Sequence, residues 1–274
     1  MVPALRRIAD TAALAFAAML AVIAPLQGCA SHAAPLLLTQ PVVLLGEVHD
    51  NAAQHALRLA AFRALLASGA RPVLAMEQID RERQVELDAV LARWPPPHAR
   101  EVVAAVGGPG WDWAFYTPFI ALALEYRLPI VAANVGREDA RRVMREGLAA
   151  TGFDANVPEQ LLTAQAGGIQ ASHCGTLDAA SARRMALAQI ARDQLMAHVL
   201  EQHAQRGVVL LAGDGHARTD IGVPYWLDAA TRARSESIGF VETGNDDAPF
   251  DRRVVTAPQP RADPCLALRP PPKP

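Results

Sequence analysis

The sequence predicts an α/β fold in which a mainly parallel β-sheet is flanked by helices. A smaller helical insertion is expected to cap the crevice at the carboxyl ends of the strands. Short apolar runs typical of buried strands alternate with helical patterns through the middle of the chain. Ionisable residues follow directly after three of these runs. With 274 residues, 51% of them hydrophobic, the chain can bury a large core.

The first 28 residues are predicted to be a lipoprotein signal peptide. Arg6 and Arg7 precede the apolar run 12–25, which is too short to span a membrane comfortably. The run ends in Leu-Gln-Gly-Cys, which resembles a bacterial lipobox and implies cleavage before Cys29 and a diacylglycerol group on its sulfur. The acyl chains of the lipid, such as palmitate, would anchor the protein in the cell envelope, and Ala30 favours the outer membrane. The alternative is an ordinary signal peptide with an incidental cysteine.

After a tether at 29–40, the predicted domain begins with a strand at 42–45. Gly46 ends it, and a helix follows with Leu57, Ala60, Ala61, Leu65 and Ala67 on roughly one side. A second strand at 72–76 leads through Glu77 into a charged helix at 81–93.

Residues 94–126 form the first part of the helical insertion. Five aromatic residues cluster there, in a chain that is only 5% aromatic: Trp111, Trp113, Phe115, Tyr116 and Phe119. They could form a satellite core that holds the insertion to the sheet. They could also form the wall of a site for a flat ligand.

The remaining elements are a third strand at 129–133, a helix at 138–150, a helix at 159–166 that Gly167-Gly168 ends, and a long helix at 179–206. Residues 138–206 are the second part of the insertion. A fourth strand at 208–212 and two more at 238–241 and 253–256 complete the domain, 41–257. The Pro-rich tail, 258–274, is expected to be disordered.

Glu47, His49, Glu77, Arg81 and His216 are the candidate site residues, because each follows a predicted strand. Side chains at the carboxyl ends of parallel strands share one crevice. Gly46 to His49 and Gly213 to His216 are both Gly-x-x-His segments. The imidazoles could ligate a metal, deprotonate water, or flank a cofactor. Glu77 and Arg81, four residues apart, could form an ion pair on one helical turn.

Several segments together resemble the ChaN family of haem-binding bacterial lipoproteins. They are LLGEVHDNAAQH, AMEQIDR, WDWAFYTP, AQIARDQLMAHVL and LLAGDGHARTDIGVP. The resemblance implies haem or iron acquisition, with haem bound between two protomers of a homodimer and a tyrosine as iron ligand. Tyr116 is the first candidate for that ligand and Tyr225 the second. His55 and His173 are further haem-binding candidates, and Asp193 could orient a site histidine.

At greater distance, the two Gly-x-x-His segments with Glu-x-x-x-Arg resemble the superfamily of erythromycin esterase and the TIKI/TraB proteins. This resemblance implies a hydrolase as the alternative, esterase- or peptidase-like. His49 or His216 would activate water, and Glu47 or Glu77 would serve as base or as ligand of a divalent metal. His49, His216 and Glu47 are accordingly the alternative metal ligands.

The net charge of −2 gives no indication of nucleic-acid binding. Cys174 and Cys265 remain once Cys29 is acylated. In an oxidising compartment they could form a disulfide, or both could be free buried thiols.

Overall fold

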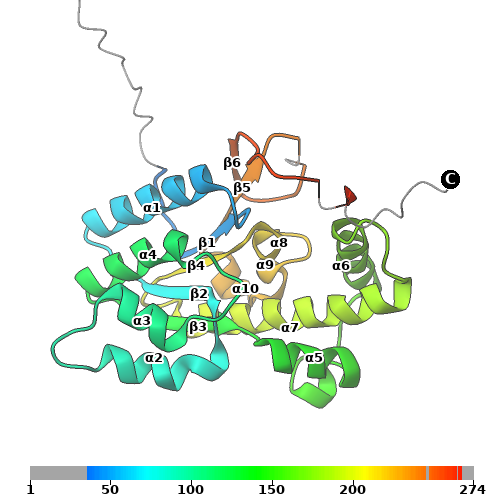
Figure 1. Cartoon of the computed structure of the whole chain (residues 1–274), viewed down its shortest axis with the longest axis horizontal. Coiled ribbons are helices and arrows are strands. Elements are labelled where there is room, and N and C mark those ends of the chain that lie inside the picture. The colour runs from blue at the N-terminus through cyan, green and yellow to red at the C-terminus, as the bar shows by residue number, and fades with distance from the viewer. Residues whose placement is uncertain (1–35, 245–246, 264, 267–274) are drawn as a thin grey trace, which may run out of the picture. The chain divides into compact units, whose positions relative to one another are not determined.

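The structure, a computed structural model, describes residues 36–244, 247–263 and 265–266 (Figure 1). The predicted signal peptide, the lipidation site at Cys29, most of the tether and residues 267–274 therefore lie outside the described residues. In the described part of the chain, no helix is both long and apolar enough to cross a membrane.

The core is a six-stranded sheet in the order β3-β2-β4-β1-β5-β6, and every pairing is parallel. This confirms the predicted fold class. The two central strands consist of fully buried residues, as expected for a sheet covered on both faces. The strands are β1 (Val42–Glu47), β2 (Val73–Asp80), β3 (Ile130–Asn134), β4 (Val208–Gly213), β5 (Ser235–Glu242) and β6 (Arg252–Thr256).

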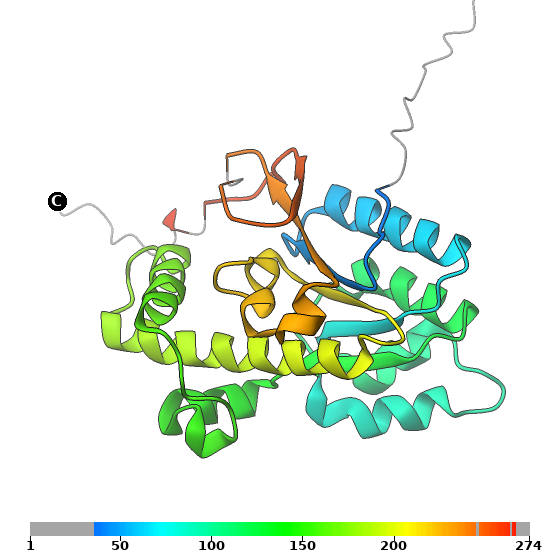
Figure 2. The same cartoon turned by 180° about the vertical axis from the view of Figure 1, so that it is seen from behind.

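Helices cover the two faces of the sheet with separate apolar cores. Val43, Leu45 and their neighbours on one face pack against α1, α2, α3 and α4. Val42 and Leu44 on the other face pack against α7, which runs behind the sheet (Figures 1 and 2). The longer helices are α1 (Ala52–Ala67), α2 (Gln84–Leu91), α3 (Ala99–Val106), α4 (Trp113–Glu125), α5 (Arg137–Glu146), α6 (Glu159–Ser172) and α7 (Ala179–His203). The short ones are η1 (Arg81–Arg83), η2 (Ala149–Thr151), α8 (Asp214–Ala217), α9 (Val223–Trp226) and α10 (Ala229–Arg232).

Three predicted features are wrong. The second strand does not end at residue 76, because β2 continues to Asp80; the helical segment after it begins at Arg81 as expected, first as η1 and then as α2. α6 runs through Gly167 and Gly168 to Ser172, because each glycine costs a helix only about 1 kcal/mol. The buried face of α1 contains Gln54, His55, Arg58, Ala61, Phe62 and Leu66, whereas Leu57 is exposed.

The segment after β6 is attached to the domain rather than disordered up to residue 263. The guanidinium of Arg261 pairs with Asp50 and Glu242, each at 2.7 Å. A disulfide joins Cys265 to Cys174, which follows α6. This segment therefore connects the end of the β5–β6 pair to the end of α6, as both views of the ribbon show (Figures 1 and 2).

Candidate functional site

Glu47 is the centre of a buried polar cluster at the end of β1. Its carboxylate forms an ion pair with Arg58 and accepts a hydrogen bond from the hydroxyl of Tyr116. Nδ1 of His55 lies 3.1 Å from Oε2, and Nδ1 of His49 lies 3.2 Å from Oε1. Four side chains, from α1, α4 and the loop after β1, therefore meet at the one carboxylate that ends β1.

Arg58 supplies the positive charge that this buried carboxylate needs, and sequence reasoning missed it. Its side chain is fully buried, and burial lowers its pKa to about 10, so the guanidinium stays charged at neutral pH. The sequence signal was the spacing: Arg58 lies one turn after His55 and Gln54, on the same face of α1.

Tyr116, the first candidate for the iron ligand, lies buried beside Glu47. The residue is 0% exposed, and its hydroxyl donates a hydrogen bond to the Glu47 carboxylate. Burial raises the pKa of the hydroxyl above its ordinary value. A phenolate ligand would need the opposite shift in pKa and open space at the oxygen. In this arrangement Tyr116 belongs to the core beneath the crevice, and its assignment as haem ligand stays a prediction.

His49 is the accessible member of the cluster, with half of its side chain exposed. The ring packs edge-on against Trp111, with centroids 4.9 Å apart. His55 lies deeper, stacked on Phe115 with its Nε2 2.9 Å from the carbonyl oxygen of His49. Burial lowers the pKa of His55. The aromatic insertion therefore serves as core at Phe115 and Tyr116 and as a wall beside the open crevice at Trp111.

A second cluster joins Glu77 and His216, as expected, to Asp193 of α7. Nδ1 of His216 lies 2.5 Å from Asp193, and Nε2 lies 3.4 Å from Glu77. Glu77 also accepts a hydrogen bond from the backbone amide of Gly213 at 2.7 Å. Gln165 of α6 donates to the second oxygen of Asp193 at 3.2 Å. Both ring nitrogens of His216 are thereby occupied.

Electrostatics makes His216 a cation. Burial alone would lower its pKa, but the charges of Glu77 and Asp193 outweigh burial and raise it to about 10. Burial alone would raise the pKa of Glu77, but the positive charge of His216 outweighs burial and lowers this pKa to about 2. Burial raises the pKa of Asp193 to about 6. At neutral pH the cluster is an imidazolium between two carboxylates, so His216 is neither a base nor a free metal ligand.

Arg81 does not join the site. Because β2 extends through Asp80, Glu77 and Arg81 are not on one helical turn, and the predicted ion pair is wrong. Arg81 instead pairs with Asp139 at 2.5 Å and with Glu82 at 3.0 Å.

Two further haem candidates lie outside the polar clusters. Tyr225, 37% exposed, lines a separate cavity of about 230 Å³ with Ser235, the first residue of β5. Ser235 is at the opposite end of the parallel sheet from Glu47. His173 follows α6, and its Nδ1 lies 2.8 Å from the carbonyl oxygen of Ile169.

A protein-bound metal ion does not fit the residues present. Within the described ranges, no group of three or more His, Cys, Asp or Glu side chains is arranged to hold one. The reason is geometric, since Glu47 is engaged by Arg58 and Tyr116, and Glu77 by His216 and Gly213. The expected divalent metal with His49, His216 and Glu47 as ligands is therefore not supported.

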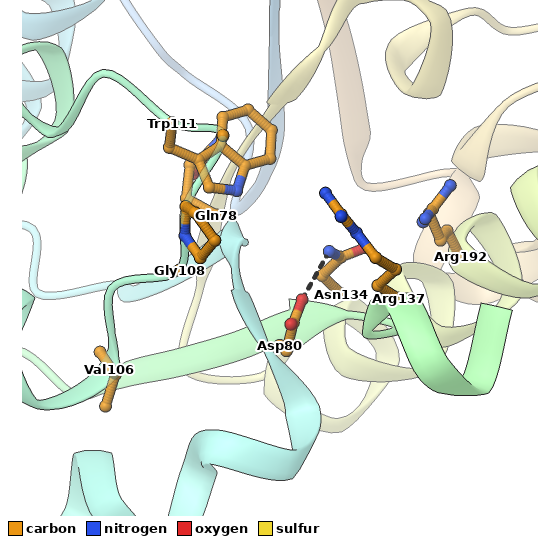
Figure 3. A pocket seen from close by; sticks show the side chains of 10 residues that line it. Gln78, Asp80, Val106, Gly108, Trp111, Asn134, Arg137 and Arg192 are labelled. Carbon is orange, nitrogen blue, oxygen red and sulfur yellow. Dashed lines mark hydrogen bonds between the residues drawn. The ribbon is translucent and has the colours of Figure 1, made fainter. Parts of the chain in front are cut away.

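Two cavities flank these clusters at the crevice. The larger, about 430 Å³, lies beside Trp111 (Figure 3) and is lined by Gln78, Asp80, Val106, Gly108, Pro109, Gly110, Trp111, Asn134, Arg137 and Arg192. The smaller, about 320 Å³, lies between α6 and the short helix α8 that carries His216. The groups open to a ligand are thus the imidazole of His49, which Glu47 orients, the indole of Trp111, and a cavity lined by Arg137 and Arg192.

Comparison with known proteins identifies the class of protein. Residues 34–227 match the family described as haem-binding uptake, Tiki superfamily, ChaN, and the chain belongs to this family. It is similar to a structure titled cofacial heme binding to ChaN of Campylobacter jejuni, at 21% identity and a TM-score of 0.67. That match covers 77% of this chain and 86% of the other.

A more distant similarity is to an erythromycin esterase, EreC, in its open conformation. The identity is 13% and the TM-score 0.44, over 75% of this chain and 71% of the other. A comparison with curated proteins gave no match.

Proposed function

We propose that this protein binds haem at the mouth of the crevice, with His49 as the iron ligand and Trp111 beside the macrocycle. The family of the chain supports the choice of ligand class. The observation that carries the assignment is that His49 alone, among the four side chains around Glu47 in the described cluster, combines a half-exposed side chain with a flat aromatic neighbour.

The residues present fit this role. An imidazole that ligates metal through one nitrogen is commonly oriented by a carboxylate at the other, which fixes the tautomer and increases the basicity of the ligand. Glu47 lies 3.2 Å from Nδ1 of His49, which leaves Nε2 for a ligand. Bound haem would supply iron and its redox chemistry, and the chain's own groups would bind and orient it.

The cellular setting is part of the same proposal. The lipobox supports an anchor at Cys29 in the cell envelope, at the outer membrane, where the protein would serve haem or iron acquisition. A homodimer in the haem-loaded state agrees with a ligand bound at an open crevice, because a second copy could cover the exposed face of a flat macrocycle.

The test is a haemin titration of the mature chain, from residue 30 on, followed by Soret absorbance. The His49→Ala variant should lose saturable binding. His198→Ala, which replaces an exposed histidine of α7, should bind like the wild type. Equal binding by all three proteins would reject His49 as the ligand, and absence of saturable binding in the wild type would reject the function.

A second candidate function, hydrolysis, is favoured by the same His49–Glu47 pair next to a large cavity. An imidazole braced by a carboxylate can act as a general base toward water. Under this hypothesis His49→Ala would abolish turnover of ester or peptide substrates while Glu47→Gln reduces it. A panel of nitrophenyl esters and chromogenic peptides tests it, and no turnover by the wild type would reject it.

A further inference from the structure

The 430 Å³ cavity beside Trp111 contains buried polar atoms that lack partners. Gln78, at the end of β2, is 2% exposed, and Asn134, at the end of β3, is 9% exposed. Nδ2 of Asn134 donates to Asp80 at 2.8 Å, but its Oδ1 has no hydrogen-bond partner among the described residues. In the same part of the chain, neither amide atom of Gln78 has a partner of good hydrogen-bond geometry, although the amide lies within hydrogen-bonding reach of Tyr116 and acts to lower the pKa of that hydroxyl.

Such atoms indicate a ligand. A buried polar atom without a partner costs about 1–3 kcal/mol, so folded proteins rarely keep several in one place unless water or a ligand pairs with them. Here three such atoms belong to Gln78 and Asn134, which stand at the ends of adjacent strands and both line one cavity. The cavity therefore suits a ligand that can both donate and accept hydrogen bonds, either directly or through bound water.

The cations of the cavity define the charge of that ligand. Arg137, in the first turn of α5, and Arg192 of α7 project to the same side of the strand ends, with Asn134 next to them (Figure 3). Arg192 donates to Gln189 at 3.1 Å, and neither guanidinium forms a salt bridge with a carboxylate in the described part of the chain. Asp80 offsets one of the two charges, which leaves the lining positive.

Guanidinium groups bind carboxylates with two parallel hydrogen bonds, which distinguishes them from lysine. The opposite wall consists of Trp111 and the Gly108-Pro109-Gly110 turn, which offer a flat apolar surface (Figure 3). Trp111 also contacts His49. A ligand that starts at His49 can thus lie along the indole and place a side chain with a carboxylate between the two arginines.

We infer that this cavity is a carboxylate site, and that Arg137 and Arg192, with the amides of Gln78 and Asn134, receive a propionate side chain of the bound haem. This inference rests on the proposed haem binding. The same chemistry would also accept a free dicarboxylate, so the experiment includes both sources.

The experiment compares haemin, haemin dimethyl ester and glutarate by calorimetry with the mature chain. The test variant is Arg137→Gln/Arg192→Gln, and the matched control is Arg145→Gln/Arg184→Gln, which replaces one exposed arginine on each of the same two helices. The wild type and the control should bind haemin at least about tenfold more tightly than the ester, the effect of one charge-assisted hydrogen bond. The test variant should bind both forms equally.

The outcomes separate this inference from the proposed function. If haemin binds and the test variant keeps the preference for the free acid, the carboxylate site is wrong while haem binding stands. If haemin does not bind but glutarate does, and only in proteins that retain Arg137 and Arg192, the site holds a free dicarboxylate and the haem proposal is wrong. If neither binds to the wild type, both are overturned.

Discussion

Asp193, in the middle of α7, lies 2.5 Å from Nδ1 of His216 and so fixes the imidazolium that Glu77 contacts from the other side. The acceptor and the imidazole come from different elements, and the contact connects the long helix α7 to the short helix α8 that follows β4. A helix that would otherwise only cover one face of the sheet thereby positions a charge at the crevice.

This relationship predicts a pH dependence of stability. The pKa of His216 is about 10 in the folded chain and near 6.5 in an unfolded one. Its proton therefore stabilises the fold fully below pH 6.5, and the contribution is lost as the pH rises towards 10. Glu77 and Asp193 are ionised between pH 7 and pH 10, so their contribution to the free energy of unfolding does not change over this range. Urea unfolding should show a fall on the order of 3–4 kcal/mol between pH 7 and pH 10.

In Asp193→Asn one of the two carboxylates that raise the pKa of His216 is gone, so the fall should be smaller and should end at lower pH. The His216 ring resonances, followed by NMR, give the pKa directly. A His216 that titrates near pH 6.5 in the wild type would contradict the assignment of an imidazolium.

Arg58→Met should destabilise the protein strongly, because it leaves the Glu47 carboxylate buried without its counter-charge. Breaking a buried ion pair in this way costs about 3–5 kcal/mol. Urea unfolding measures the loss, and the double variant Glu47→Gln/Arg58→Met should recover part of it. Arg63→Met, at an exposed position of the same helix, is the control and should change stability little.

Tyr116→Phe should leave haem binding unchanged, because the hydroxyl is buried against Glu47 rather than open to a ligand. Stability should fall by about 1–2 kcal/mol for the lost hydrogen bond to a charged group. A haemin titration and a thermal unfolding curve check the two effects. Loss of the Soret spectrum with unchanged stability would instead restore Tyr116 as the iron ligand.

Gly213→Ala should weaken haem binding through His49. A Cβ atom at Gly213 would lie 2.9 Å from Cε1 and 3.1 Å from Nε2 of the imidazole, so the ring must move. Gly215→Ala is the matched control, since a Cβ there meets nothing within 4 Å. Haemin affinity should fall at least about tenfold in the first variant, equivalent to 1.4 kcal/mol. Equal affinities would show that the position of His49 does not govern binding.

Reduction of the Cys174–Cys265 disulfide should lower stability. The bond joins residues 91 positions apart, and a loop of that size contributes up to about 4–5 kcal/mol in the chain-entropy description. Differential scanning calorimetry with and without dithiothreitol measures the change, with Cys174→Ser/Cys265→Ser as a second test. The double variant should not respond to the reductant, and an unchanged wild-type transition would contradict the prediction.

The sequence predicted the parallel sheet because strand-forming runs and helical patterns alternate clearly, and the convergence of Glu47, His49, Glu77 and His216 follows from strand direction alone. Side-chain partners could not be derived in that way. Glu77 and Arg81 seemed to be one helical turn apart only because the end of β2 was set four residues too early. The role of Arg58 depends on which face of α1 is buried. That face carries the polar residues Gln54 and His55, so the spacing of apolar residues along α1 did not reveal it.

The strand order also has a consequence for how the protein is made. β1, near the start of the domain, pairs with β4 and β5, so Val42 lies beside Val208 and Ser235. Val42 therefore stays without its partner in β4 for 166 further residues (208 − 42) and without its partner in β5 for 193 (235 − 42). Long-range pairing of this kind slows folding, so a chain that emerges from the ribosome cannot complete the centre of its sheet until both β4 and β5 have been synthesised.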